Sequence, residues 1–204
     1  MKRLFYATTL AVALAFAGRS FPADGQPDAL LRVLTSEVLA TVSGYKDADV
    51  RAASKLAKLI ELKVEPHFNV TRMTQIAMAE NWTRATPEQQ KALTAEFRTL
   101  LIHTYSTVLS NYRNQSIEFT PLEMAPADVK VTVKSIMKQP GTNPLKIDYQ
   151  MANTPAGWKV YEITVDGVNL IANYRGTFAA RIREGGVDHL INSLRDKNRQ
   201  NQPA

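Results

Sequence analysis

The three histidines are the side chains best suited to acid–base or metal chemistry near neutral pH, because imidazole titrates in that range. His67 follows a proline, His103 falls in a long helical stretch, and His189 lies near the C-terminus. No two histidines are four residues apart and no Glu-x-x-His motif occurs, so their spacing gives no metal site. The chain also has no Gly-x-Ser-x-Gly elbow, no P-loop and no Gly-x-Gly-x-x-Gly motif. We expect each histidine to be a surface or core residue.

Three carboxylates, with His103 as an alternative, keep an enzyme hypothesis open. An Asp or Glu facing the apolar cavity of a cone-shaped α+β fold can act as a general acid or base if its pKa is perturbed. The candidates are Asp148, Glu162 and Asp166. The positions expected to face inward on these strands are instead apolar throughout: Val131, Val133, Ile147, Tyr149 and Ile163. The sequence therefore favours binding over catalysis, and we expect no enzymatic activity, no metal and no cofactor.

Residues 157–175 predict a strand that turns directly into a helix. Asp166-Gly167 supplies the turn, since Gly tolerates positive φ and Asp can bond to its own backbone. The strand residues are aromatic or β-branched, which suits a pleated surface: Trp158, Val160, Tyr161, Ile163 and Val165. After the turn, apolar residues recur at helical spacing: Val168, Ile171, Tyr174 (with Arg175 beside it), Phe178 and Ile182. Such a corner can form the floor and wall of an apolar cavity.

The middle of the chain predicts a curved antiparallel sheet of four strands, from about residue 115 to 165. Apolar and polar residues alternate around Val131, Val133, Ile147 and Tyr149, which gives the sheet one apolar and one wet face. Turns fall at Pro140-Gly141 and 155–157. The alternation breaks between Val160 and Tyr161, so that strand either contains a bulge or is covered on both faces.

Helices are predicted on both sides of this sheet in the sequence, which makes the fold α+β. The first carries an apolar stripe from Leu30 to Val42, and two more are expected at about 48–62 and 71–80, separated by a turn at 65–68. The longest runs from Pro87 to Tyr112, with Thr86 and Gln89 forming a capping box. Near the C-terminus, Gly185-Gly186 separates two further helices.

The N-terminus has the pattern of a secretory signal. Lys2 and Arg3 precede an uncharged apolar run that ends in a small-x-small site at Ala15-Phe16-Ala17. The run of about fourteen residues is shorter than the roughly 20 needed to cross a bilayer, although an uncleaved anchor is the alternative. We expect residues 1–17 to be a signal peptide, cleaved after Ala17 or, less favourably, after Ala23. Residues 18–204 then form one domain with a polar, flexible tail from about residue 199.

Composition excludes several classes of protein. The chain has no cysteine, which rules out disulfides, thiol chemistry and a lipoprotein anchor, and leaves a packed core to hold an exported domain together. The formal net charge of +6 becomes +4 once Lys2 and Arg3 are removed. The densest basic run, residues 181–199, lacks the aromatic residues that stack on nucleic acid bases. We expect solvated helix faces there, or a weak attraction to anionic lipid headgroups, and no nucleic acid partner.

Three blocks of sequence point to one family. The first is Trp-Lys-Val-Tyr-Glu at 158–162, followed by Val-Asp-Gly-Val-Asn-Leu-Ile at 165–171 and Asn-Tyr-Arg at 173–175. The second runs from Trp82-Thr83-Arg84-Ala85-Thr86-Pro87-Glu88-Gln89-Gln90 through Phe97 to Thr104-Tyr105, and the third is Gly186-Val187-Asp188-His189-Leu190-Ile191. In this order the blocks, which span residues 28–198, resemble the MlaC family, also called the toluene-tolerance auxiliary family.

The resemblance implies a periplasmic phospholipid carrier of the Mla pathway in a Gram-negative bacterium, which maintains outer-membrane lipid asymmetry. It also implies a glycerophospholipid as cargo and two partners: a lipoprotein-containing complex at the outer membrane and an ATP-driven lipid transporter at the inner one. We expect the carrier to be a monomer. An interaction module whose apolar face docks a partner helix is a further alternative.

In the family, the sheet face and the surrounding helices line a cavity for acyl chains. By strand alternation and helical stripes we assign its lining to Leu101, Tyr105, Val131, Val133, Ile147, Tyr149, Val160, Ile163, Val168 and Ile171. Tyr174 lies near the stripe shared with Ile171, and Arg175 lies about 100° around the helix from it. An Arg there can keep its stem on the cavity rim and offer its guanidinium to a phosphate. A salt bridge or simple solvation is the alternative role for Arg175.

Overall fold

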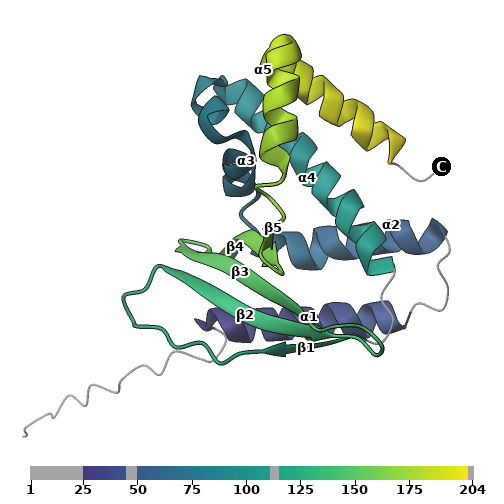
Figure 1. Ribbon diagram of the computed structural model, residues 1–204, viewed down its shortest axis with the longest axis vertical. Helices are drawn as coiled ribbons and strands as arrows, with labels where there is room; N and C mark the ends of the chain where they lie inside the picture. The colour runs from purple at the N-terminus through teal and green to yellow at the C-terminus, as the bar shows by residue number, and fades with distance from the viewer. Residues whose placement is uncertain (1–24, 45–49, 111–114, 202–204) are drawn as a thin grey trace, which may run out of the picture.

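Five antiparallel strands form an open, curved sheet, and helices pack against it and above it (Figure 1). The computed structural model describes residues 25–44, 50–110 and 115–201. The strands follow chain order across the sheet, as predicted for a meander. They are β1 Ser116–Phe119, β2 Lys130–Lys138, β3 Leu145–Thr154, β4 Gly157–Val165 and β5 Val168–Asn169. The predicted α+β class is confirmed, with five strands in place of four.

The helices lie close to their predicted positions. The α-helices are α1 Pro27–Ser43, α2 Val50–Leu59, α3 Val70–Met78, α4 Pro87–Ser110 and α5 Tyr174–Gln200. A π-helical turn, Ile60–Val64, and a 3-10 turn, Glu65–His67, connect α2 to α3, and a second 3-10 turn, Ala79–Arg84, precedes α4. Tyr112, the predicted end of α4, and the signal peptide fall outside the described residues. At the C-terminus α5 continues to Gln200, slightly beyond the expected start of the tail.

The start of α4 shows the predicted capping box. The backbone N–H of Gln89 donates to Thr86 Oγ1 at 3.2 Å, and the N–H of Thr86 donates to Gln89 Oε1 at 3.0 Å. Two N–H groups that the first turn of a helix leaves unpaired are satisfied in this way. The cap therefore fixes where the long helix begins.

The sheet has the predicted apolar and polar faces. Cross-strand neighbours on the inner face include Val133 with Tyr149 and Tyr149 with Ile163, while Lys134 pairs with Asp148 on the outer face. The predicted irregularity in β4 is a β-bulge: Gln150 pairs with Glu162 and the next residue, Met151, pairs with Val160. Tyr161 is the extra residue, and both it and Val160 are buried.

The path from β4 into α5 differs from the prediction. Asp166 and Gly167 have φ values of 46° and 83°, and two successive residues in this region close a tight hairpin. The chain therefore reverses into β5, where Val168 pairs with Val165, and the helix begins only at Tyr174. The expectation that Val168 starts a helix, and hence lies on its stripe, is wrong for this reason.

The buried apolar residues form two clusters. The helical core comes from α3, α4, α5 and Ile171, and includes Met78, Phe97, Leu101 and Phe178. The sheet core joins α1 and α2 to the inner sheet face: Leu31, Leu34, Val38, Val42, Leu56, Val133, Met151 and Val160. Figure 1 shows the corresponding arrangement, with α3, α4 and α5 on one side of the molecule and the sheet with α1 on the other.

Helix α5 consists of two straight parts joined by the predicted glycine pair. Gly185 and Gly186 have non-helical backbone angles, and the φ of Gly186 is +78°. Phe178 from the first part and Leu190, Ile191 and Leu194 from the second all enter the helical core. The kink thus lets one chain segment pack twice against the same core.

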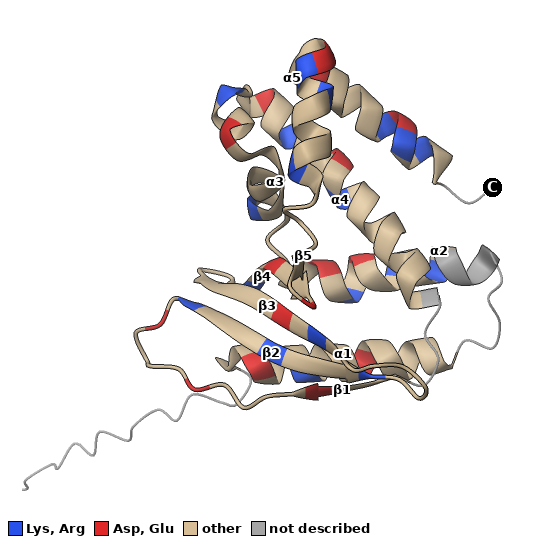
Figure 2. Ribbon diagram, in the orientation of Figure 1, with Lys and Arg blue, Asp and Glu red and all other residues tan. Residues whose placement is uncertain are grey.

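Charged residues of both signs are interspersed along the helices (Figure 2). In the basic run of α5, Arg195 Nε contacts Glu96 Oε1 at 3.0 Å and Arg181 contacts Glu184 at 2.8 Å, while Arg199 pairs with Asp196. Much of the positive charge in this run is therefore paired locally, as expected for solvated helix faces.

Candidate functional site

Helix α4 passes from the helical core to the sheet core, and its apolar face is incompletely covered between them. Leu101 is buried in the helical core, Tyr105 is only partly buried against it, and Leu109 packs against the sheet core. Val108, seven positions after Leu101 and so on nearly the same face, is 59% exposed. Burial along this stripe therefore decreases where the helix leaves the helical core.

The inner face of the sheet shows a similar gradient. Val133 and Val160 are fully buried, whereas Tyr149 and Ile163 are partly buried. Ile147, opposite Val165 at the end of the apolar row, is partly exposed and belongs to neither core. The sheet therefore keeps an apolar surface that the described helices do not fully cover.

These two surfaces approach each other where the cores meet, a region we name the core junction. We define it by Phe68, Tyr105, Leu109, Ile163 and Tyr174. Phe68 packs against both cores, and the short segment from Ile163 in the sheet core to Ile171 in the helical core closes one side. The N–H of Leu170 donates to the carbonyl of Ile163 at 2.9 Å, which holds that segment against the sheet.

Asn169 fixes the turn that carries Ile171 and Tyr174 into the junction. Its Oδ1 accepts hydrogen bonds from the N–H groups of Ile171 at 3.0 Å and Ala172 at 2.8 Å. Its Nδ2 donates to a carboxylate oxygen of Glu162 on β4. One side chain thus connects the strand to Ile171 and Ala172 in the turn before α5.

Three partly buried tyrosines place hydroxyl groups in this otherwise apolar region. Burial raises the pKa of Tyr105 to about 12, with a smaller contribution from nearby Tyr174. Burial also raises the pKa values of Tyr149 and Tyr174, and hydrogen bonds with Ser135 and Thr104 respectively oppose the increase. All three phenols are therefore neutral at physiological pH and can donate hydrogen bonds.

Arg175 has a defined partner at the start of α5. Its Nε donates to the carbonyl oxygen of Ile76 in α3 at 2.9 Å, although the residue is exposed overall. The guanidinium therefore links α3 to α5. Within the described residues its two terminal nitrogens make no hydrogen bond or ion pair, so these N–H groups face solvent.

With this geometry in place, comparison with known proteins identifies the family. The model of the family described as MlaC protein matches residues 32–196. The chain belongs to the MlaC family. The family expected from the three sequence blocks is confirmed.

Two MlaC-family relatives align with this chain over most of their length. The toluene tolerance protein ttg2D of Pseudomonas putida is 26% identical over 165 residues, which cover 79% of this chain and 75% of that protein. The intermembrane phospholipid transport system binding protein MlaC of Haemophilus influenzae is 18% identical over 197 residues, or 95% of this chain and 92% of the relative.

A solved structure also matches this MlaC-family fold. It is the phospholipid-binding protein from Ralstonia solanacearum in complex with a phospholipid, determined at 1.53 Å resolution. The TM-score is 0.75 and the sequence identity 38%, over 88% of this chain and 99% of that one. At this similarity the overall path of the two chains is shared.

The residues predicted to line a cavity divide between the two cores of this MlaC-family protein. Leu101 and Ile171 are buried in the helical core, with Tyr105 and Tyr174 packed at its edge. Val133 and Val160 are buried in the sheet core, with partly buried residues beside them: Val131, Tyr149 and Ile163. Val168 lies on β5 and is 50% exposed.

Some residues of the core junction were not among the predicted site residues. Phe68 was assigned to a turn after Pro66, but its backbone pairs with Val160 as an isolated bridge and its ring packs against both cores. Leu109 falls within the long helix predicted from Pro87 to Tyr112 but was not among the predicted lining residues. Since helical periodicity is the same along all of α4, nothing in the spacing marks where the helix leaves one core for the other.

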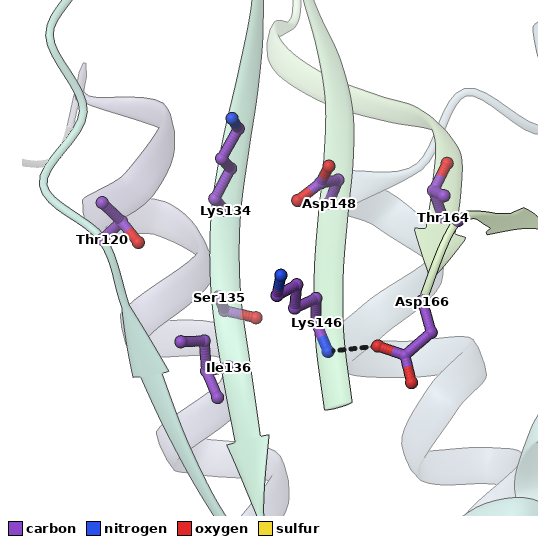
Figure 3. A pocket seen from close by; sticks show the side chains of 9 residues that line it. Thr120, Lys134, Ser135, Ile136, Lys146, Asp148, Thr164 and Asp166 are labelled. Carbon is purple, nitrogen blue, oxygen red and sulfur yellow. Dashed lines mark hydrogen bonds between the residues drawn. The ribbon is translucent and has the colours of Figure 1, made fainter. Parts of the chain in front are cut away.

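The carboxylates of the enzyme hypothesis lie away from the apolar face. Asp148 and Asp166 line a hollow of about 630 Å³ on the polar face of the sheet, beside Lys134 and Lys146 (Figure 3). Asp166 Oδ1 accepts a hydrogen bond from the N–H of Lys146 at 2.8 Å. Asp148 thus lies among lysines on the polar face of the sheet and does not face the apolar cavity that the enzyme hypothesis requires.

His67 and His189 lie in different parts of the fold and have different neighbours. His67 is partly buried beside Lys159, and burial followed by this charge lowers its pKa. His189 lies 3.4 Å from Glu184 on the surface of α5. The described ranges contain no group of three or more His, Asp or Glu placed to hold a metal ion. Nor does any helix within them combine the length and apolar character of a membrane span.

Proposed function

We propose that this protein carries glycerophospholipid and holds the acyl chains at the core junction. The observation that carries the proposal is the pair of apolar surfaces, on α4 and on the sheet, whose burial decreases where they face each other. The Ralstonia relative of the same fold binds a phospholipid, which supports it. The proposed lining comprises the junction residues together with Leu101, Val131, Ile147, Tyr149 and Ile171.

The physical advantage of such a carrier is large. Each methylene removed from water contributes about 0.8 kcal/mol, so two chains of about fifteen methylenes represent roughly 20–25 kcal/mol. A protein interior replaces the bilayer as the hydrocarbon environment of these chains, and the transfer itself is nearly isoenergetic. The carrier therefore supplies no direction, which must come from the proteins that load and unload it.

We further propose that the chain acts in the periplasm of a Gram-negative bacterium after removal of residues 1–17. Its partners would be a lipoprotein-containing complex at the outer membrane and an ATP-driven transporter at the inner membrane. The relative from Haemophilus is named as part of an intermembrane phospholipid transport system, which supports this role. Residues 18–204 act as one domain in this proposal, without enzymatic activity, because the candidate acids Asp148 and Asp166 lie on the polar sheet face.

Native mass spectrometry tests the carrier role. Protein purified under non-denaturing conditions from the periplasm of a Gram-negative host should show additional mass that corresponds to phospholipid. After extraction of this lipid, vesicles should restore it. Protein that is empty as purified and stays empty after incubation with vesicles contradicts the proposal. Capture of a partner helix by such empty protein would favour the interaction module instead.

A further inference from the structure

Strand β1 forms one edge of the sheet and has a neighbouring strand only on the β2 side. In an antiparallel pair, alternate residues direct both of their main-chain groups to the neighbouring strand. The N–H of Thr120 donates to the carbonyl of Lys134 in β2 at 2.9 Å, and Glu118 follows in the same register. Ile117 and Phe119 therefore direct their N–H and C=O groups away from β2, to the open edge.

Most of these edge groups have no partner within the part of the chain that the structure describes. The carbonyl of Phe119 accepts a hydrogen bond from Arg32 Nη2 at 3.0 Å. The N–H and C=O of Ile117 and the N–H of Phe119 make no hydrogen bond to another described residue. Such groups can pair with a further strand, and edges are commonly protected by a proline or a bulge. Strand β1 has no proline and pairs with β2 in unbroken register, so neither device protects it.

A groove of about 610 Å³ runs between this edge and helix α1, which lies beside β1 (Figure 1). This volume is within the range of about 300–1,000 Å³ that is typical of ligand sites. Leu34, Val38 and Val42 of α1 are buried in the sheet core, and an adjacent face of the helix borders the groove: Arg32, Ser36, Leu39 and Ser43. Ile117 and Phe119 border it from β1. A groove between a helix and an open strand edge can accept an extended chain.

The charge of the groove favours an acidic occupant. Among the described residues that line it, Arg32 alone is charged. Its guanidinium lies over the ring of Phe119, 5.3 Å from the centroid, and its Nη2 is also 3.7 Å from Asp28 Oδ2. Arg32 Nε and Nη1 make no hydrogen bond to another described residue. The guanidinium is thus held in place with N–H groups that can bind a carboxylate.

A second copy of this chain fits the edge less well than a different protein does. Pairing Ile117 of each copy with Phe119 of the other uses all the edge groups. In that register the two Glu118 side chains stand directly opposite each other, and like charges in opposed positions destabilise a sheet. A second copy also brings another Arg32 to the groove, where the charge favours a carboxylate.

We infer that an extended, acidic segment of a partner protein adds to β1 in the groove beside α1. The main chain of this segment pairs with Ile117 and with the N–H of Phe119, and one of its carboxylates binds Arg32. Main-chain hydrogen bonds supply the affinity, and side chains along the groove supply the specificity. The groove shares no residue with the core junction, so the inference does not depend on the proposed lipid-carrier role.

A phage-displayed library of random short peptides is the probe for this groove. Selection on the purified protein should yield peptides enriched in Asp and Glu. Ile117→Pro removes an N–H that points to the open edge and leaves the bonds to β2 in place. It should weaken binding of a selected peptide about tenfold, as expected for loss of a main-chain hydrogen bond. Ile117→Val, which keeps the N–H, is the matched control and should bind normally.

The same peptide tests the role of Arg32. Arg32→Gln should weaken its binding about threefold or more, because an exposed charge-assisted contact is lost. Arg183→Gln removes an exposed arginine on α5 and should leave the binding unchanged. Equal binding by wild type and Arg32→Gln overturns the assignment of an acidic occupant.

Amide hydrogen exchange measured by NMR locates the peptide. In the free protein the N–H groups of Ile117 and Phe119 should exchange faster than that of Glu118, which faces β2. Bound peptide should slow the exchange of Ile117 and Phe119. Unchanged exchange at both residues overturns the inference, as does selection that yields no peptide.

Two further results also overturn the inference. One is equal peptide binding by wild type and folded Ile117→Pro. The other is self-association of the protein that Ile117→Pro abolishes, which assigns the edge to a second copy. Circular dichroism shows whether each variant folds. Ser36→Trp fills the groove from an exposed position of α1 and replaces Ile117→Pro if the proline variant does not fold.

Discussion

At the scale of single residues, several side chains of the segment 157–175 each stabilise a particular feature of the fold. Asp166 and Gly167 close the hairpin, Asn169 caps the following turn and bonds Glu162, and Arg175 reaches α3. The residue types were correct indicators of a strand and a turn. The hairpin was missed because Asp-Gly also serves simple turns, and only the positive φ of both residues makes the chain reverse.

The contact of Arg175 with Ile76 predicts a structural effect of its removal. Arg175→Ala should lower the free energy of unfolding by about 1 kcal/mol, because an exposed charge-assisted hydrogen bond between α3 and α5 is lost. Lipid content per folded molecule should change little. Chemical denaturation and native mass spectrometry measure the two quantities on the same preparation.

Arg183→Ala provides the control for Arg175, since Arg183 is exposed on the same helix and forms no ion pair within the described residues. It should leave both quantities unchanged. If Arg175→Ala instead loses most of its lipid at nearly normal stability, the guanidinium contacts the phosphate as the sequence suggested.

At the scale of elements, the end of a helix could be predicted from the sequence where a nearby side chain forms a hydrogen bond with an unpaired backbone group of that end. The capping box at Thr86 was predictable because both partners lie within one turn. The π-helical turn at Ile60–Val64 was not, since it is stabilised from outside: Arg98 of α4 contacts Glu61 at 3.1 Å and Glu65 at 3.0 Å. Those two carboxylates are four residues apart and meet their cation only in the folded chain.

The kink in α5 predicts opposite effects for two glycines of that helix. Gly186→Ala should destabilise the protein by about 1 kcal/mol or more, because a residue with a Cβ is strained at a φ of +78°. Gly176→Ala should be neutral or should stabilise by up to about 1 kcal/mol, since alanine favours helix and the added Cβ meets nothing within 4 Å. Thermal and urea unfolding of the two variants decide the matter. Equal effects would mean that the kink is not required for packing.

At the scale of the whole molecule, the sequence identified the apolar faces but not how they are shared. Periodicity gave Val133, Val160, Ile147 and Ile163 one face of the sheet, and the register confirms this alignment. Periodicity did not indicate that residues of α1 and α2 pack with Val133 in the sheet core, whereas Ile147 stays partly exposed outside both cores. That distinction depends on which helices cross which end of the sheet, and this is a property of three-dimensional packing.

The two cores predict different results for two tryptophan substitutions on this face. Ile147→Trp should reduce lipid content severalfold while the fold survives, because Ile147 is partly exposed and outside both cores. Val133→Trp should instead destabilise the protein by roughly 1–3 kcal/mol, as expected for overpacking a residue with no exposed surface. Circular dichroism with native mass spectrometry separates these outcomes. Full lipid content in folded Ile147→Trp would place the acyl chains elsewhere.

The extra residue in β4 has a consequence for how this chain tolerates insertions and deletions. Before Tyr161 the strand turns its odd and even positions one way, and after it the other way. Loss of Tyr161 alone would remove the bulge and leave a regular strand, with Val160 and Ile163 still on the apolar side and Glu162 and Thr164 still toward water. Loss of a residue elsewhere in β4 would instead turn the residues between the gap and the bulge to the opposite face. Related chains that differ by one residue within this strand should therefore differ at the position of Tyr161.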